Sequence, residues 1–253
     1  MDRFMPTASF RSPETERLTV TDVVLEHPST AAVFERFGID YGCGGAQLLA
    51  NACQKAGCSI EQLTEALEHS EPAAVERDWR SAPLADLVQQ IVEQHHSFTR
   101  KEVQRLGALV AEVVSIDGDN HSEFRRLQRS VGELSSELLQ HMEKEEDLLF
   151  PYILELEQAA LFSRRPHESA FGTIQNPVAA MVMEHEVSGQ TLDAFRELTG
   201  NYVVPPGVCA SVKVLYQALP AFAADLHQHI HLENNILFPR AVELEEQLNR
   251  LSR

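Results

Sequence analysis

The feature that most constrains this chain is an internal repeat. The segment from Leu138 to Glu157 aligns with the segment from Leu226 to Glu245 at an offset of 88 residues, and ten of the twenty aligned positions are identical. Both copies contain the pattern His-x-x-x-Glu, followed a few residues later by Leu-Phe-Pro. A repeat of this kind predicts that the chain folds as two similar halves.

The repeated pattern carries metal-binding residue types at helical spacing. Residues four apart lie on one face of a helix, so the His and Glu of each copy can reach the same point. One further histidine precedes each copy at an aligned position. Together the two halves supply His96, His141, Glu145, His185, His229 and Glu233. A single His-x-x-x-Glu pair is more often a solvated surface pair, but its duplication within matching apolar frameworks favours ligation.

The number of these residues indicates two metal ions. A structural zinc site takes four ligands in a tetrahedron, whereas four imidazoles and two carboxylates suit two metals that share the carboxylates. A histidine-rich set with two carboxylates fits haemerythrin-like di-iron chemistry, in which two histidines, one oxygen from each glutamate and a bridging oxo or hydroxo group would give each iron five ligands. The sequence therefore predicts two non-haem iron ions, oxo- or hydroxo-bridged, each with one position open to a small molecule.

Apolar residues recur at three- and four-residue spacing through most of the second part of the chain. The four segments with this pattern are 84–114, 124–156, 178–198 and 208–244. Short connections rich in glycine and proline separate them. The pattern predicts an all-α protein whose main domain is an up-down four-helix bundle. The histidine-rich set of predicted ligands is what makes this bundle haemerythrin-like.

The rest of the chain suggests a second, smaller domain. We expect a flexible tail over 1–17, a small helical module over 18–69, a linker over 70–82 and the bundle over 83–248. The module contains a Gly-Cys-Gly-Gly turn around Cys43, whose glycine density demands a tight turn.

Two helix starts in the module are predicted from capping residues. Ser59 and Gln62 form a Ser-x-x-Gln capping-box pattern, which predicts a helix beginning at about residue 59. For the first helix, Thr21 or Asp22 is the predicted N-cap.

Further carboxylates lie close in sequence to the predicted ligands. Glu137 and Asp225 each lie four residues before a ligand histidine, and Glu184 adjoins His185. Carboxylates there can accept the distal N–H of a ligand histidine or line a polar route to the metals. A solvated helix face explains them equally well.

The other histidines near the repeat are predicted to lie away from the centre. His227 and His231 are two residues from His229, which turns them to the opposite side of the helix, so we expect both to be exposed. His95 adjoins His96 and points about 100° away. We expect it to support a ligand or to lie on the surface.

Composition excludes several classes of function. A formal net charge of −17 argues against nucleic acid as a partner. No run of 18 apolar residues is present to span a membrane, and the first residues lack the apolar core of a signal peptide. The four cysteines fit no zinc motif. These observations predict a protein of the reducing cytoplasm.

The motifs together resemble one known family. The signatures are His141-Met142-Glu143-Lys144-Glu145-Glu146 with Leu149-Phe150-Pro151, the triplet Met183-Glu184-His185, and the run from His229 to Arg240. They resemble the repair-of-iron-centres family, whose members are di-iron proteins that repair iron–sulfur clusters. The resemblance covers about Leu18 to Glu246.

The resemblance implies roles for individual residues. The six predicted ligands match the family's iron ligands, and Glu137 and Glu184 match glutamates that line its access channels. Family members carry an aromatic-Cys-Cys-Gly-Gly turn, but here Gly42 stands in place of the first cysteine. Cys43 is therefore either a reactive thiol or a small packing residue.

The resemblance also implies a function. It implies a cytoplasmic protein that restores iron–sulfur clusters damaged by nitric oxide or peroxide, by supplying iron or by capturing NO. Its partners would be damaged iron–sulfur proteins as clients and NO or O2 as small ligands, and a homodimer is one assembly to consider. Two other readings stay open: a haemerythrin-like sensor or carrier of O2 or NO, and a di-iron NO reductase or peroxidase.

Overall fold

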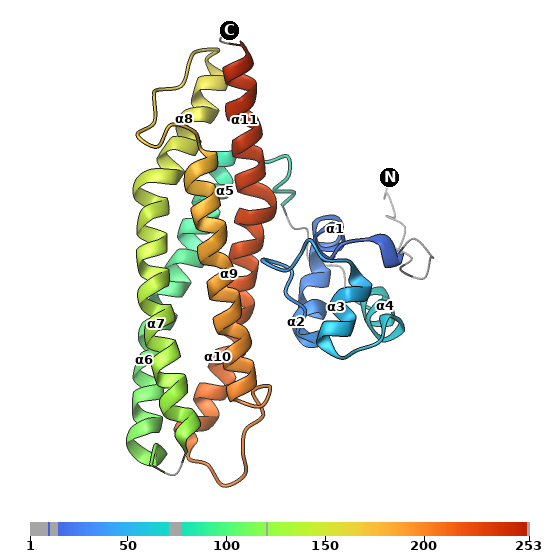
Figure 1. Cartoon of the computed structure of the whole chain (residues 1–253), viewed down its shortest axis with the longest axis vertical. Coiled ribbons are helices and arrows are strands. Elements are labelled where there is room, and N and C mark those ends of the chain that lie inside the picture. The colour runs from blue at the N-terminus through green and yellow to red at the C-terminus, as the bar shows by residue number, and fades with distance from the viewer. Residues whose placement is uncertain (1–9, 11–14, 71–76, 120, 252–253) are drawn as a thin grey trace. The chain divides into compact units, whose positions relative to one another are not determined.

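The computed structural model of the chain describes residues 10, 15–70, 77–119 and 121–251. The chain divides into two compact units, with the boundary between Asp78 and Trp79. Positions 1–9 and 11–14 of the predicted tail and positions 71–76 of the predicted linker lie outside the described residues. The regular elements of both units are helices (Figure 1), so the all-α prediction is confirmed.

The first unit is a small module of short helices packed around its own core. Its elements are the 3₁₀ turns Thr15–Arg17 and Pro28–Thr30 and the helices α1 (Val20–Glu26), α2 (Ala31–Phe37), α3 (Leu49–Ala56) and α4 (Ile60–Glu68). Phe34, Leu49 and Leu63 are fully buried at its centre. Helices this short are marginal on their own in water, so packing of their apolar faces stabilises them.

Capping residues set two of the helix starts. Ser59 accepts from the backbone N–H of Gln62, and Gln62 accepts from the backbone N–H of Ser59, so the predicted capping box is confirmed. The prediction for α1 was wrong, because Thr19 is the N-cap and Asp22 completes a capping box with it. Asp22 therefore lies inside the helix, at its third position.

The glycine-rich turn of the module is organised by Asp40. Its carboxylate accepts the backbone N–H groups of Gly42, Cys43 and Gly44 at 2.8, 3.0 and 2.9 Å. A Cβ at Gly45 would lie 2.0 Å from Thr21 Oγ1 and 2.6 Å from the Tyr41 carbonyl oxygen, so only glycine fits. Cys43 is half-buried within this turn.

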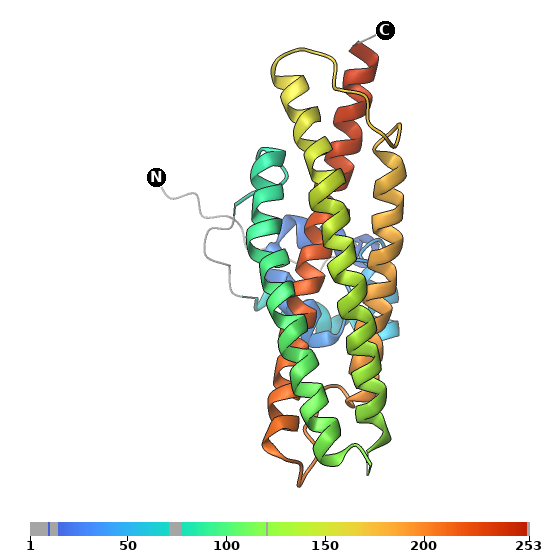
Figure 2. The ribbon, with the colours of Figure 1, turned by 90° about the vertical axis from the view of Figure 1, so that its left-hand side faces the viewer.

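The second unit is a four-helix bundle built from four long helical rods. The rods are α5 (Leu84–Gln90) with the π turn Ile91–His96 and α6 (Ser97–Asp117); α7 (Ser122–Lys144) with the π turn Glu145–Leu149 and α8 (Phe150–Leu161); α9 (Gln175–Leu198); and α10 (Ala210–Leu232) with the π turn Glu233–Leu237 and α11 (Phe238–Leu251). They run side by side in alternating directions (Figures 1 and 2), as the up-down prediction requires.

The sequence repeat also fixes where the rods begin. Glu157 accepts the backbone N–H groups of Leu84 and Ala85 at 2.6 and 3.0 Å, at the start of α5. Glu245, its partner in the repeat, accepts the N–H of Ile174 at 3.1 Å, at the start of α9. In each half, therefore, a glutamate on the second rod satisfies free N–H groups at the start of the first rod.

We expect Glu245→Gln to lower the free energy of unfolding by about 1–3 kcal/mol. Glu245 is buried and also accepts from the hydroxyls of Tyr152 and Thr173 at 2.9 and 2.6 Å. An amide retains only one accepting oxygen and no charge. Urea denaturation measures the change, and the exposed Glu243→Gln is the matched control. Equal stability of the two variants would show that the buried carboxylate does not anchor α9.

Candidate metal centre

The six predicted residues converge at the middle of the bundle. Each is at least 97% buried, although every one of them is ionisable. They form two groups of potential metal ligands, in each of which the ligand atoms lie within 4.8 Å of one another. The first group is His96, Glu145, His229 and Glu233, and the second is His141, Glu145, His185 and Glu233. Both glutamates therefore belong to both groups.

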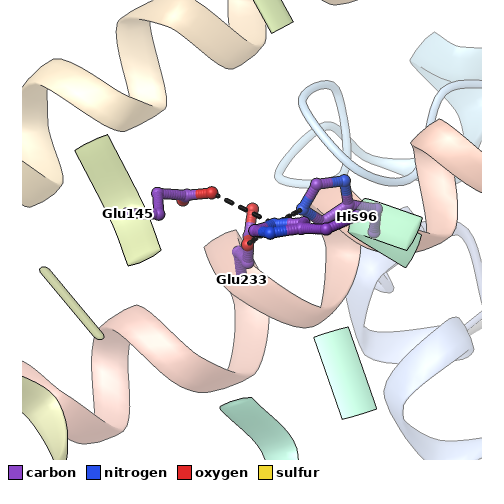
Figure 3. A group of neighbouring side chains, drawn as sticks. His96, Glu145 and Glu233 are labelled. Carbon is purple, nitrogen blue, oxygen red and sulfur yellow. Dashed lines mark hydrogen bonds and ion pairs between the residues drawn. The ribbon is translucent and has the colours of Figure 1, made fainter. Parts of the chain in front are cut away.

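The first group brings two imidazoles and two carboxylates together from three rods. His96 Nε2 lies 3.1 Å from His229 Nε2 and 3.3 Å from Glu145 Oε2. Glu233 Oε1 lies 3.0 Å from His229 Nε2 and 3.9 Å from His96 Nε2. Figure 3 shows the carboxylates of Glu145 and Glu233 reaching toward the His96 ring from separate helices.

The second group repeats this arrangement with the other two histidines. His141 Nε2 lies 2.9 Å from His185 Nε2 and 3.3 Å from Glu145 Oε2. Glu233 Oε2 lies 3.2 Å from His185 Nε2. Glu233 thus presents one oxygen to each group. Each group also combines histidines from both halves of the repeat, so neither half completes a group by itself.

The contacts within the centre fit metal ions better than they fit hydrogen bonds. Neither oxygen of Glu145 has a hydrogen-bond partner among the described residues, and the same is true of Glu233 Oε2. Buried carboxylate oxygens that accept no hydrogen bond are costly unless a cation satisfies them. Two imidazole nitrogens bonded at right angles to one metal at roughly 2.1 Å would be about 3.0 Å apart, close to the separations found here.

Without metal, protons on the histidines balance the two buried carboxylates. Burial opposes the charge on His96, but Glu145 and Glu233 outweigh it and raise the pKa of His96 to about 10. The same balance raises the pKa of His141 to about 9. Burial and mutual repulsion disfavour ionisation of the glutamates, but the neighbouring histidines lower the pKa of both. Burial lowers the pKa of His229.

We expect metal loading at pH 7 to release about two protons per chain. His96 and His141 are protonated at this pH because their pKa values lie near 10 and 9. A metal must displace those protons, so metal affinity should rise with pH up to about pH 10, the higher of the two pKa values. Anaerobic calorimetry with Fe²⁺ in buffers of different ionisation enthalpy counts the released protons. Loading without proton release at pH 7 would contradict the assignment of these two rings.

Three of the four histidines are oriented through their outer ring nitrogen. His96 Nδ1 lies 2.6 Å from Glu146, His141 Nδ1 lies 2.9 Å from Glu184, and His185 Nδ1 lies 2.8 Å from Asn234. Such contacts fix the tautomer, so that Nδ1 donates and Nε2 is free to bind a metal. Of these partners only Glu184 was considered from sequence. Glu146 and Asn234 each follow a ligand glutamate at equivalent repeat positions, which is the signal that could have found them.

The two halves differ around the fourth histidine. His229 Nδ1 is buried without a hydrogen-bond partner among the described residues. His95 occupies the repeat position of Glu184, and its ring stacks on His229 with centroids 5.8 Å apart. Asp225 contacts His95 Nδ1 at 3.1 Å rather than His229. Glu137, at the repeat position of Asp225, is exposed, and the described contacts include no hydrogen bond from it to a histidine.

The prediction that His227 and His231 are exposed was wrong. Their exposed fractions are 5% and 6%, and His231 Nδ1 lies 3.0 Å from Asn235. Helix α10 is buried on several sides, because Leu226, His227 and the whole stretch 229–233 are buried. A helix buried all round has no solvent side to which polar residues can turn. Neither ring belongs to a ligand group.

Glu145 and Glu233, the two glutamates of the centre, each open a π turn. The backbone N–H of Phe150 bonds the Glu145 carbonyl, and that of Phe238 bonds the Glu233 carbonyl, five residues back in both rods. Pro151 and Pro239 follow at once and have no N–H to donate. The structure places this wider turn directly before each proline. Such turns occur frequently at functional sites.

Comparison with known proteins agrees with this arrangement. Residues 87–241 match the haemerythrin HHE cation-binding domain, and residues 16–71 match a domain of unknown function, DUF542. Iron-sulfur cluster repair protein YtfE of Escherichia coli O17:K52:H18 is 32% identical over 221 residues, which is 87% of this chain and 94% of that protein. The proteins of the same name from Shigella boydii serotype 4 and Citrobacter koseri are 32% and 31% identical over the same shares.

The chain belongs to the haemerythrin-like iron–sulfur cluster repair family. Both units of the structure have a counterpart in the family, because the two matched domains fall on either side of the boundary between Asp78 and Trp79. Its haemerythrin domain is a di-iron domain, and the donor set at the bundle centre fits that cofactor. None of the described helices is long and apolar enough to cross a membrane.

Proposed function

We propose that two non-haem iron ions are held by the six buried residues of the bundle centre. One iron would take His96 and His229, the other His141 and His185, and both would share Glu145 and Glu233. The observation that carries this proposal is the pair of ligand groups with both carboxylates in common. Four protein atoms per group are fewer than octahedral iron accepts, so positions remain for small ligands.

We further propose that this di-iron protein acts in the cytoplasm, where it repairs iron–sulfur clusters damaged by nitrosative or oxidative stress. The repair function rests on the likeness to the YtfE proteins over 87% of the chain. Its clients would be damaged iron–sulfur proteins. When bound, iron supplies redox chemistry and affinity for NO or O2, and a labile iron is also the cargo that a damaged cluster needs.

The residues around the centre hold the ligand rings in position. Glu146 contacts both His96 Nδ1 at 2.6 Å and Arg100 Nη2 at 2.9 Å. Glu184 contacts both His141 Nδ1 at 2.9 Å and Lys144 Nζ at 2.5 Å. Each chain runs from a cation near the surface through a carboxylate to a ligand ring. A carboxylate that faces Nδ1 accepts the Nδ1–H and leaves Nε2 free to bind a metal.

Metal analysis tests the first part of the proposal. Protein produced with iron should contain about two irons per chain, as the two ligand groups require. Its absorption spectrum should show charge-transfer bands in the near ultraviolet. A ratio near one, or tightly held zinc in place of iron after iron-rich growth, would refute the di-iron assignment.

Anaerobic exposure of the reduced protein to NO separates repair from the alternatives. Transfer of iron to an apo-cluster acceptor, with recovery of that acceptor's activity, supports repair. Formation of nitrous oxide would instead make the protein an NO reductase, and stable retention of NO without iron transfer would make it a sensor or carrier. The module at 18–69 favours repair, because a simple carrier has no need of a second domain.

A further inference from the structure

Two cysteines of the N-terminal module are brought together by the end of helix α3. The helix stops at Gly57, which adopts a left-handed conformation with φ of 73°. The N–H of Cys58 bonds the carbonyl of Cys53 at 3.0 Å, and that of Gly57 bonds the carbonyl of Gln54 at 3.3 Å. This pair of bonds defines a Schellman motif, in which the side chains at the positions of Cys53 and Cys58 pack on each other.

The two thiols have different surroundings. Cys53 is 2% exposed and belongs to the core of the module, whereas Cys58 is only partly buried and packs against that core. Their side chains interact directly, and burial together with this contact raises the pKa of the Cys53 thiol to about 12. Cys53 therefore keeps its proton at neutral pH, and Cys58 is the thiol that solvent reaches.

We propose that Cys53 and Cys58 are a peroxide-sensitive thiol pair that forms a reversible disulfide within the module. This proposal is independent of the metal centre, because both cysteines lie in the first unit and all six metal ligands lie in the second. The proposed pair is also distinct from the two adjacent cysteines of the family's glycine-rich turn. In this chain that turn keeps only Cys43, because Gly42 stands in place of the other cysteine. The capping box at Ser59 holds Cys58 at the end of the turn.

The reaction balances with hydrogen peroxide as the oxidant. The Cys58 thiol attacks one peroxide oxygen, the O–O bond breaks, and a sulfenic acid and one water are formed. The Cys53 sulfur then attacks the sulfenic sulfur. The S–S bond forms, the S–O bond breaks, and the hydroxyl leaves with the Cys53 proton as a second water. Two thiols lose two electrons to one peroxide, and a dithiol reductant reverses the change.

Trypsin provides a direct test on the full-length protein, because Lys55 lies between the two cysteines. Digestion separates Cys53, in the peptide 37–55, from Cys58, in the peptide 56–77. A disulfide between them joins these peptides, and mass spectrometry detects the joined species. Because Cys43 shares the first peptide, the decisive sample is Cys43→Ser, in which Cys53 is the only cysteine of the peptide 37–55.

We expect mild peroxide to reduce the free thiols from four to two per wild-type chain, with dithiothreitol restoring all four. The joined peptide should form in wild type and in Cys43→Ser, and be lost in Cys58→Ser. Because Cys58 is partly exposed, this variant should keep its helical circular dichroism, which shows that loss of the link is not unfolding. Iron-loaded and chelator-treated samples should behave alike. Loss of the joined peptide in Cys43→Ser, linkage between chains, or a link that requires iron would overturn the proposal.

Discussion

Replacing Glu233 with alanine should remove both irons from the protein, whereas replacing a ligand histidine should weaken only one of the two sites. Glu233 directs Oε1 toward His229 and Oε2 toward His185, so its carboxylate serves both ligand groups. His229 belongs to one group alone. Iron content after desalting should therefore fall from about two per chain to near zero in Glu233→Ala. In His229→Ala it should fall to about one.

The matched control lies on the same helix. His227→Ala removes a buried imidazole two residues from His229, and the ring lies outside both ligand groups. It should lose stability because a buried side chain is truncated, yet retain about two irons. If His227→Ala lost as much iron as His229→Ala, packing rather than ligation would explain the losses. If Glu233→Ala retained one tightly held iron, the carboxylate would not be shared.

A chain that begins at Trp79 should fold as a helical bundle and bind about two irons without the module. All six ligands lie in the second unit, and the core of the module is formed by its own residues. Trp79 is the proper starting point because Arg240 donates hydrogen bonds to the carbonyls of Trp79 and Ala82 at 2.7 and 2.6 Å. Circular dichroism and metal analysis measure the outcome.

We propose that the module takes part in the transfer of iron to clients, so cluster repair by the same fragment should drop to the level of free iron salts. Cys43→Ser in the full-length chain is the matched test of the thiol in the glycine-rich turn. Full repair activity in that variant would make Cys43 a packing residue. A fragment that repairs clusters as well as the full chain would remove the module from the client step. A fragment that fails to bind iron would show that the bundle depends on the module.

The six residues at the centre of the bundle could be predicted because residues four apart in sequence lie on the same face of any regular helix. His141 and Glu145 are one turn apart on any regular helix, and the repeat reveals the same pair as His229 and Glu233. The fold class followed from the same periodicity. These predictions needed only the spacing of residues along one helix and the repeat of that spacing in the second half of the chain.

Features that depend on neighbouring helices were missed. The contact between Glu146 and His96 joins two rods, and single-helix phase does not say which rod a side chain faces. The burial of His227 and His231 results from a helix enclosed on several sides. The π turns at Glu145 and Glu233 change which side of the helix the following residues face. Residue types alone do not predict such turns.

The crossing of the two halves at the centre has a consequence for the order in which the protein matures. A growing chain that has emerged only through α9 carries His96, His141, Glu145 and His185, yet it completes neither group, because both lack Glu233. If these residues hold the metals as proposed, a complete site forms only when α10 and Glu233 have docked against the earlier rods. On the proposed ligand set, full iron loading would therefore mark a bundle whose four rods are already assembled.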